Sequence, residues 1–206
     1  ITNIGNGAFY GCSNLKNIIF PNTLKCIDNS AFSCCTSLNE IIIPENCESI
    51  ASYAFEYCSD LSNVIFPNSL NRIGENAFLG TALYDKQPNG LIYLNNWLIA
   101  HKGEIQESYS LKIKDGTVGI TDGIFADCKE ITSIDMPNSL KYIGYCSFWG
   151  CSNLSSIIIP SSVINIQDYA FYACNNLKLV INYSDLEISK SSHTNGNIAE
   201  YANIAI

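Results

Sequence analysis

Residues 27–44 have the sequence IDNSAFSCCTSLNEIIIP, and this pattern returns along most of the chain every 23 residues. We number each repeat from its first isoleucine, so phenylalanine stands at position 6 of every copy. The position-1 residues are Ile4, Ile27, Ile50, Ile73, Ile120, Ile143 and Ile166, and the position-6 residues are Phe9, Phe32, Phe55, Phe78, Phe125, Phe148 and Phe171. A fixed period of this kind predicts a solenoid in which each coil contacts only its neighbours.

The second half of the repeat predicts one β-strand per coil. Position 15 is always aliphatic, and proline follows at position 18 in Pro21, Pro44, Pro67, Pro137 and Pro160. A short β-branched run that ends where proline cannot donate to a ladder is typical of a strand. Because side chains alternate across a strand, we expect positions 15 and 17 in the core and positions 14 and 16 on the outer face of a parallel sheet.

The period lies in the range of leucine-rich repeats, so the predicted fold class is an α/β solenoid with a parallel concave sheet. The alanine and phenylalanine at positions 5 and 6 are expected to begin a convex segment that is helical, 3₁₀ or extended. One array without an internal boundary is expected over residues 1–188. Residue 1 falls part-way through a repeat without an initiator methionine or signal peptide, so we expect a piece of a longer protein.

An irregular stretch, residues 81–119, interrupts the repeat. Residues 91–94 and 97–100 predict two short strands around a tight Asn-Asn turn, since asparagine tolerates positive φ. Counting back from the next repeat, Leu111 and Ile113 recover positions 15 and 17. We therefore expect the solenoid to continue, with the hairpin either joining the sheet or projecting from its edge. Insertions of this kind lie at binding faces or are length variants that pack on themselves, and both remain open.

Charge and hydropathy exclude two classes of partner. The net charge of −8, from 11 basic and 19 acidic residues, disfavours nucleic acid and anionic membrane, which bind Lys and Arg. Direct membrane insertion is not expected, because the chain has no apolar run of about 18 residues.

Most of the ten cysteines belong to the repeat. Position 9 is cysteine in six copies, namely Cys12, Cys35, Cys58, Cys128, Cys151 and Cys174. Equivalent side chains of adjacent coils are about 4.8 Å apart and point the same way, whereas a disulfide needs facing Cβ atoms about 3.8 Å apart. We therefore expect a ladder of buried free thiols and neither metal nor cofactor. The other four, Cys26, Cys34, Cys47 and Cys146, are the candidates for oxidation.

The candidate binding site is the outer face of the sheet. Position 16 carries Ile19, Ile42, Ile65, Asp135, Ile158 and Ile181, with Lys112 at the equivalent place in the partial repeat, and position 14 adds Asn17, Glu40 and Asn63. A contiguous aliphatic stripe marks an interaction site, although β-branched residues also simply suit a sheet surface. Trp97, in the expected projecting hairpin, is a further candidate as an aromatic anchor. Tyr10, Trp149 and Tyr172, at position 7, are expected on the convex return.

The Cys-Ser-Asn-Leu runs at residues 12–15 and 151–154 and the Pro-Asn-Ser-Leu runs at 67–70 and 137–140 complete the pattern. With them, the chain resembles the BspA-like leucine-rich repeats of bacterial surface proteins, of Treponema pallidum type. The resemblance covers nearly all of residues 1–188, and residues 189–206 resemble the closing segment of such arrays.

This resemblance implies a right-handed superhelix in a secreted or surface-anchored protein that adheres to host matrix components or neighbouring cells. A protein partner would bind through the concave sheet and the insertion hairpin, and a glycan is a possible ligand. Catalysis is not expected, because the sequence has no Gly-rich phosphate loop, HExxH or Gly-x-Ser-x-Gly motif. The alternative is a passive spacer that presents another domain of a larger surface protein.

Overall fold

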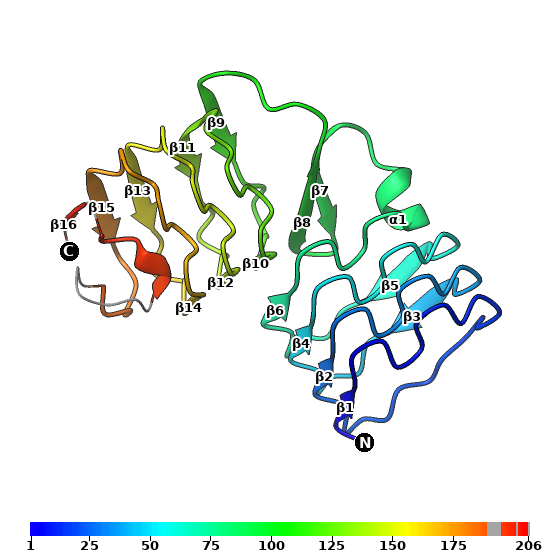
Figure 1. Cartoon of the computed structure of the whole chain (residues 1–206). Helices are drawn as coiled ribbons and strands as arrows, with labels where there is room; N and C mark the ends of the chain where they lie inside the picture. Colours follow the sequence, from blue (N-terminus) through cyan, green and yellow to red (C-terminus); the bar gives the residue numbers. More distant parts are fainter. Residues whose placement is uncertain (189–194, 201, 206) are drawn as a thin grey trace. The chain divides into compact units, whose positions relative to one another are not determined.

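The computed structural model describes residues 1–188, 195–200 and 202–205 (Figure 1). The chain divides into two compact units, Ile1–Asn95 and Asn96–Ile206. Each unit is a stack of parallel coils, so the repetitive solenoid predicted from the period is confirmed for both.

In the first unit, the coils form two parallel sheets. Strands β1, β2, β4 and β6 follow one another in a ladder that pairs Ile4 with Ile27, Ile27 with Ile50 and Ile50 with Ile73. Strands β3 and β5 form the second sheet. The elements are β1 (Asn3–Ile4), β2 (Cys26–Ile27), β3 (Glu40–Ile42), β4 (Ser49–Ile50), β5 (Asn63–Ile65), β6 (Arg72–Ile73), α1 (Ala82–Asp85) and β7 (Gly90–Leu94).

The second unit repeats this plan. Strands β8, β10, β12 and β14 pair in that order, β9 pairs with β11, and β13 pairs with β15, which pairs with β16. The elements are β8 (Trp97–Lys102), β9 (Tyr109–Lys112), β10 (Gly119–Ile120), β11 (Ile131–Asp135), β12 (Tyr142–Ile143), β13 (Ser156–Ile159), β14 (Asn165–Ile166), β15 (Leu179–Asn182), η1 (Asn195–Asn197) and β16 (Asn203–Ala205).

The prediction of one strand per coil is therefore wrong, since the position-1 isoleucines form a second ladder. Their strands are two residues long in β1, β2, β4 and β6, too short to show an alternating pattern in sequence. Each of these strands leads directly into the turns that carry the core phenylalanine, so the two ladders lie on either side of the return path.

The return path, expected to be helical, 3₁₀ or extended, is a series of hydrogen-bonded turns with no helical or 3₁₀ segment in the regular coils that the structure describes. In the first coil, Ala8, Tyr10 and Cys12 each donate their backbone N–H to the carbonyl three residues earlier, at 2.9–3.1 Å. Between them, Phe9 donates to the carbonyl of Ala31 in the next coil, at 2.7 Å. The turns thus bond alternately within the coil and to the next coil.

Left-handed residues at two fixed positions explain why no helix forms there. Positive φ values of 51–73° occur at position 4 in Gly7, Ser30, Tyr53, Asn76, Gly123, Cys146 and Tyr169, and at position 8 in Gly11, Cys34, Tyr57, Gly80, Asp127, Gly150 and Ala173. A left-handed residue every four positions interrupts any right-handed helix. In the part of the chain that is described, helix is confined to α1 and η1. The fold is a β-solenoid, the α/β class is not confirmed, and the right-handed winding remains a prediction.

Stacked phenylalanines form the centre of each unit. Ring centroids of adjacent position-6 residues are 5.0–5.5 Å apart in both units, with interplanar angles of 2–14°. This spacing confirms that successive coils lie in register, because equivalent side chains superimpose along the stack.

Four of the six position-9 cysteines, Cys35, Cys58, Cys151 and Cys174, are buried as predicted, whereas Cys12 is exposed and Cys128 is half-buried. The Cys35 and Cys58 thiols donate to the carbonyls of Phe9 and Phe32 in the preceding coil, each at 3.1 Å. The same carbonyls also accept the backbone N–H of Cys12 and Cys35, so each carbonyl oxygen accepts two hydrogen bonds, the second of them from a thiol. Cys151 and Cys174 repeat this contact in the second unit.

Burial makes these thiols poor nucleophiles. It raises the pKa of Cys58 and Cys174 to about 12, so the reactive thiolate is scarce at neutral pH. Cys47 was a candidate for oxidation, but it is buried and its pKa is raised to about 11 by desolvation. Cys26, Cys34 and Cys146 are half-buried, and their oxidation remains a prediction.

The insertion contains one further coil of the solenoid, whose sequence departs from the repeat pattern. Strand β8 pairs in parallel with β10, placing Trp97 opposite Gly119 and Leu98 opposite Ile120. Leu98 therefore takes the place of a position-1 isoleucine. Strand β9 pairs with β11, and Leu111 and Ile113 are buried as predicted for positions 15 and 17.

Candidate functional site

The outer face of the sheet has the predicted alternation. In β3, Ile41 is buried, Ile42 is 58% exposed, and the following Ile43 is buried. In β13, Ile158 is 50% exposed between two buried isoleucines. We call the surface formed by positions 14 and 16 the sheet face of each unit.

The sheet face of the first unit is mainly apolar. Strands β3 and β5 place Ile42 opposite Ile65, which is 48% exposed, and Glu40 opposite Asn63. The Asn63 side-chain N–H donates to the Glu40 carboxylate at 2.8 Å. Ile19, in the coil before β3, is 95% exposed. The structure therefore brings the predicted apolar stripe and its polar companion row together across successive coils.

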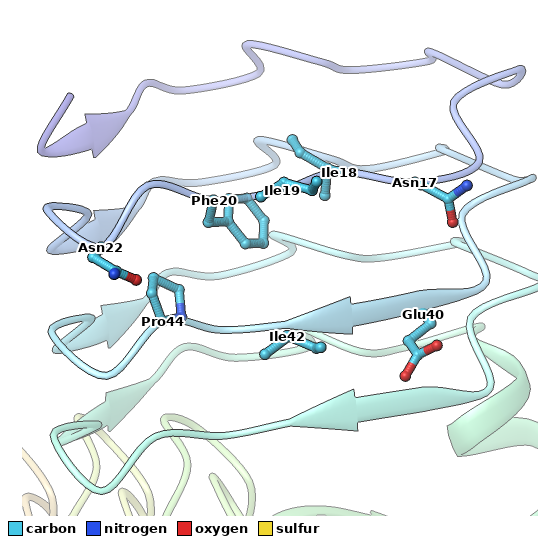
Figure 2. A pocket seen from close by; sticks show the side chains of 8 residues that line it. All are labelled: Asn17, Ile18, Ile19, Phe20, Asn22, Glu40, Ile42 and Pro44. Atoms are coloured by element: carbon cyan, nitrogen blue, oxygen red, sulfur yellow. The ribbon is translucent and has the colours of Figure 1, made fainter.

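An open hollow lies at the first two coils of this face. Figure 2 shows Glu40 and Ile42 on β3, with Asn17 and Ile19 on the preceding coil. Its lining consists of Asn17, Ile18, Ile19, Phe20, Asn22, Glu40, Ile42 and Pro44. The lining of the hollow is therefore mostly apolar, with one carboxylate and two amides among the apolar side chains.

The sheet face of the second unit carries charge where the first carries isoleucine. Strands β9 and β11 place Lys112 opposite Asp135, and both side chains are exposed. Ser110 and Ser133 share a hydrogen bond between their hydroxyls at 2.8 Å. Farther along, β13 and β15 place Ile158 opposite the half-buried Ile181.

A second hollow, on the proline side of this face, is more polar. It is lined by Asp115, Ile134, Asp135, Met136, Pro137, Asn138, Ile158, Pro160, Ser161 and Tyr183. Two carboxylates therefore border the same depression as exposed Ile158.

Trp97 is not an exposed anchor, so that prediction is wrong. Its side chain is 1% exposed and stacks on Tyr142, with ring centroids 6.0 Å apart. Gly119 lies against the indole, and any Cβ there would be 2.3 Å from a ring carbon. The tryptophan is buried because β8 joins the position-1 ladder instead of projecting. The 22-residue interval from Leu98 to Ile120 was the signal in the sequence for this coil.

The sequence also gave no prediction for Tyr145 and Tyr169, which are exposed on the turns. Tyr145 stands at position 3 and Tyr169 at position 4 of their coils. The direction of these side chains depends on the left-handed conformation at position 4, which the sequence pattern does not indicate. Tyr10, Trp149 and Tyr172, expected on the return path, are indeed exposed there.

The chemistry of the sheet faces is that of binding by apolar contact and hydrogen bonding. Among the described residues, no cluster of three or more His, Cys, Asp or Glu could hold a metal ion. His101 lies near Phe125, at 6.3 Å between ring centroids, and burial lowers its pKa. No helix within the described ranges has the length and apolar character needed to cross a membrane.

The sequence matches the BspA type leucine rich repeat region, in six copies, over residues 1–98 and 104–204. The chain belongs to the BspA-type leucine-rich repeat family. Membership confirms the family inferred from the repeat and indicates a protein-interaction module of a kind that is typically non-catalytic.

Several solved structures are similar to this BspA-type chain. A leucine-rich cell surface protein from Faecalibacterium prausnitzii A2-165 is 23% identical, with a TM-score of 0.43, covering 100% of this chain and 70% of that one. A leucine-rich repeat protein from Bacteroides ovatus ATCC 8483 is 24% identical, with a TM-score of 0.41, covering 88% and 58%. The T. pallidum leucine-rich repeat protein is 24% identical, with a TM-score of 0.35, covering 79% and 64%. No curated protein matches the chain.

Proposed function

We propose that the chain is a non-catalytic, extracellular adhesion module that binds a protein partner through the sheet face of its first unit. The supporting observation is the pair Ile42 and Ile65, side by side in the register of β3 and β5 and each about half exposed, at 58% and 48%. Apolar side chains exposed in a contiguous row lose water when a partner covers them, which drives association.

The polar row beside the stripe gives this surface specificity. Glu40 and Asn63 are already hydrogen-bonded to each other, so their free lone pairs and donors face a partner in a fixed geometry. A glycan would also be accepted by such amide and carboxylate groups. The charged pair Lys112 and Asp135 extends the proposed contact chemistry to the sheet face of the second unit. We place the protein outside the cell or at its surface.

The test is to replace Ile42 and Ile65 together with Asp. Both side chains are half exposed, so we expect a folded protein, checked by circular dichroism and thermal unfolding, that binds host matrix proteins at least about ten-fold more weakly. Ile164→Asp is the matched control, since this isoleucine is 58% exposed, as Ile42 is, and stands outside positions 14 and 16 in the second unit. Unchanged binding by the folded double variant would overturn the proposal and favour a passive spacer.

A further inference from the structure

Four aromatic side chains gather on the turns of the second unit. Tyr145 and Trp149 come from the coil that begins at Ile143, and Tyr169 and Tyr172 from the next coil. Tyr145 and Tyr169 meet edge to face with centroids 5.8 Å apart, and Tyr169 meets Tyr172 in the same way at 5.7 Å. We call these four residues the aromatic patch.

The patch is open to solvent, although Tyr169 contacts both Tyr145 and Tyr172. Each of the four side chains is 37–43% exposed. The backbone holds neighbouring members at adjacent coils, because the N–H of Gly150, next to Trp149, donates to the Tyr172 carbonyl at 2.8 Å. Ring surface is therefore presented by a rigid, hydrogen-bonded set of turns.

Tyr169 occupies a strained backbone position. Its φ is 58°, in the left-handed region where glycine stands at the same position of two other coils, Gly7 and Gly123. Position 4 is left-handed in all seven regular coils, and Tyr53 adopts the same conformation in the first unit with φ of 61°, so the conformation belongs to the repeat and not to the patch alone.

Acidic side chains border the patch. Asp168 precedes Tyr169, and its carbonyl accepts the N–H of Cys146, the residue after Tyr145, at 3.3 Å. Asp127 donates its backbone N–H to the Trp149 carbonyl at 2.6 Å, and its carboxylate lies beside Gly150. Both aspartates are exposed. A hydrogen bond with the Cys146 side chain, followed by smaller effects that include the Asp168 charge, raises the pKa of Tyr145.

We propose that the aromatic patch, with Asp127 and Asp168, binds a cationic peptide segment of another protein, one that carries arginine or lysine. A cation over a tyrosine or tryptophan face is attracted by the ring quadrupole, and the two carboxylates add charge complementarity. Arginine is favoured because its guanidinium stacks on rings and pairs with carboxylates. A second copy of this chain, with its net charge of −8, has the wrong sign for this surface. The patch lies on the turns and is independent of the sheet-face proposal.

The test is titration with a hexa-arginine peptide, followed by calorimetry and by the emission of Trp149. Trp97 is buried and is the only other tryptophan, so a change in emission on binding reports on the patch. We expect saturable binding that weakens as salt rises, because exposed charges are screened. Hexa-lysine should bind more weakly, and hexa-glutamate should not bind.

Two sets of variants separate the patch from general attraction to an acidic protein. Tyr169→Ser with Tyr172→Ser copies the serines that stand at the same positions in the second coil, Ser30 and Ser33, so we expect it to fold. It should weaken hexa-arginine binding about ten-fold through lost cation–π contacts. Tyr10→Ser, also at position 7 but in the first unit, is the control and should bind as the parent does.

Asp127→Asn with Asp168→Asn leaves the rings in place and should also weaken binding several-fold. Equal affinity of the parent and the two double variants, or a response to a neutral oligosaccharide in place of hexa-arginine, would overturn the proposal. Loss of matrix binding in the Ile42 and Ile65 variant has no bearing on this result, so the two proposals fail separately.

Discussion

The sheet faces of the two units share a backbone plan and differ in chemistry. In the first unit, β3 and β5 present Ile42 and Ile65 side by side. In the second, β9 and β11 present Lys112 and Asp135 at the same repeat position. The buried residues show no such difference, since stacked phenylalanines and thiol-to-carbonyl contacts occur in both units.

This difference separates what the fold requires from what it leaves free. An inward side chain must match the coils above and below it, so each coil constrains the next. An outward side chain meets solvent and only its neighbours in the row. The exposed positions can therefore vary from coil to coil without loss of the stack, and recognition is expected to reside in them.

The largest effect is expected from the core. Phe55→Ala and Phe148→Ala each remove a fully buried ring that stacks on two neighbours, at 5.3 and 5.5 Å in the first unit and at 5.4 and 5.2 Å in the second. Each variant should lose about 3–5 kcal/mol of unfolding free energy. Urea unfolding of the two variants measures this free energy. A loss of stability in only one of the two variants would show that the two cores are not equivalent.

The core was the part that the sequence predicted best. The 23-residue interval placed the ladder of position-6 phenylalanines, and alternation placed Ile41 inside and Ile42 outside. Both follow from periodicity, which a buried face imposes on sequence. The apolar stripe could be predicted for the same reason, because a residue between two inward positions must face out.

The turns and the insertion could not be predicted in the same way. Position 4 is occupied by Gly7, Ser30, Tyr53, Asn76, Gly123, Cys146 and Tyr169, a set with no shared chemistry, so its left-handed conformation left no pattern in the sequence. That conformation comes from hydrogen bonds between coils, which override local preference. Trp97 was misplaced because Leu98 stands 22 residues before Ile120, one short of the repeat.

An intermediate effect is expected at the turns. Gly7 has φ of 60° and Gly123 has φ of 67°, one in each unit at position 4. Gly7→Ala and Gly123→Ala should each cost about 1 kcal/mol, because alanine is disfavoured in the left-handed region. At Gly7 the new Cβ has room, since its nearest neighbour is 3.8 Å away, so the cost there reports on φ alone.

Ser30→Gly is the reverse change at the same position, where serine already has φ of 54°. Relief of strain should offset or exceed the entropy that glycine gains in the unfolded chain, so stability should not fall. Thermal unfolding of these variants measures the sign. Stabilisation by Gly7→Ala would show that the turns are not left-handed in solution.

The smallest effect on stability is expected from exchanging the chemistry of the two sheet faces. Lys112→Ile with Asp135→Ile gives the second unit the aliphatic row of the first. Cross-strand pairs of opposite charge contribute about 0.2–1 kcal/mol, and isoleucine recovers part of this through its strand preference. We therefore expect the free energy of unfolding, measured with urea, to change by no more than about 0.5 kcal/mol. The difference should shrink further at high salt, because exposed charges are screened. If an aliphatic row is sufficient for recognition, the Lys112→Ile, Asp135→Ile variant should also bind more of the matrix partner than the parent does, at unchanged stability. Unchanged binding would show that the isoleucines alone do not distinguish the first unit from the second. The hollow around Ile19 and the Glu40–Asn63 pair would then account for the difference.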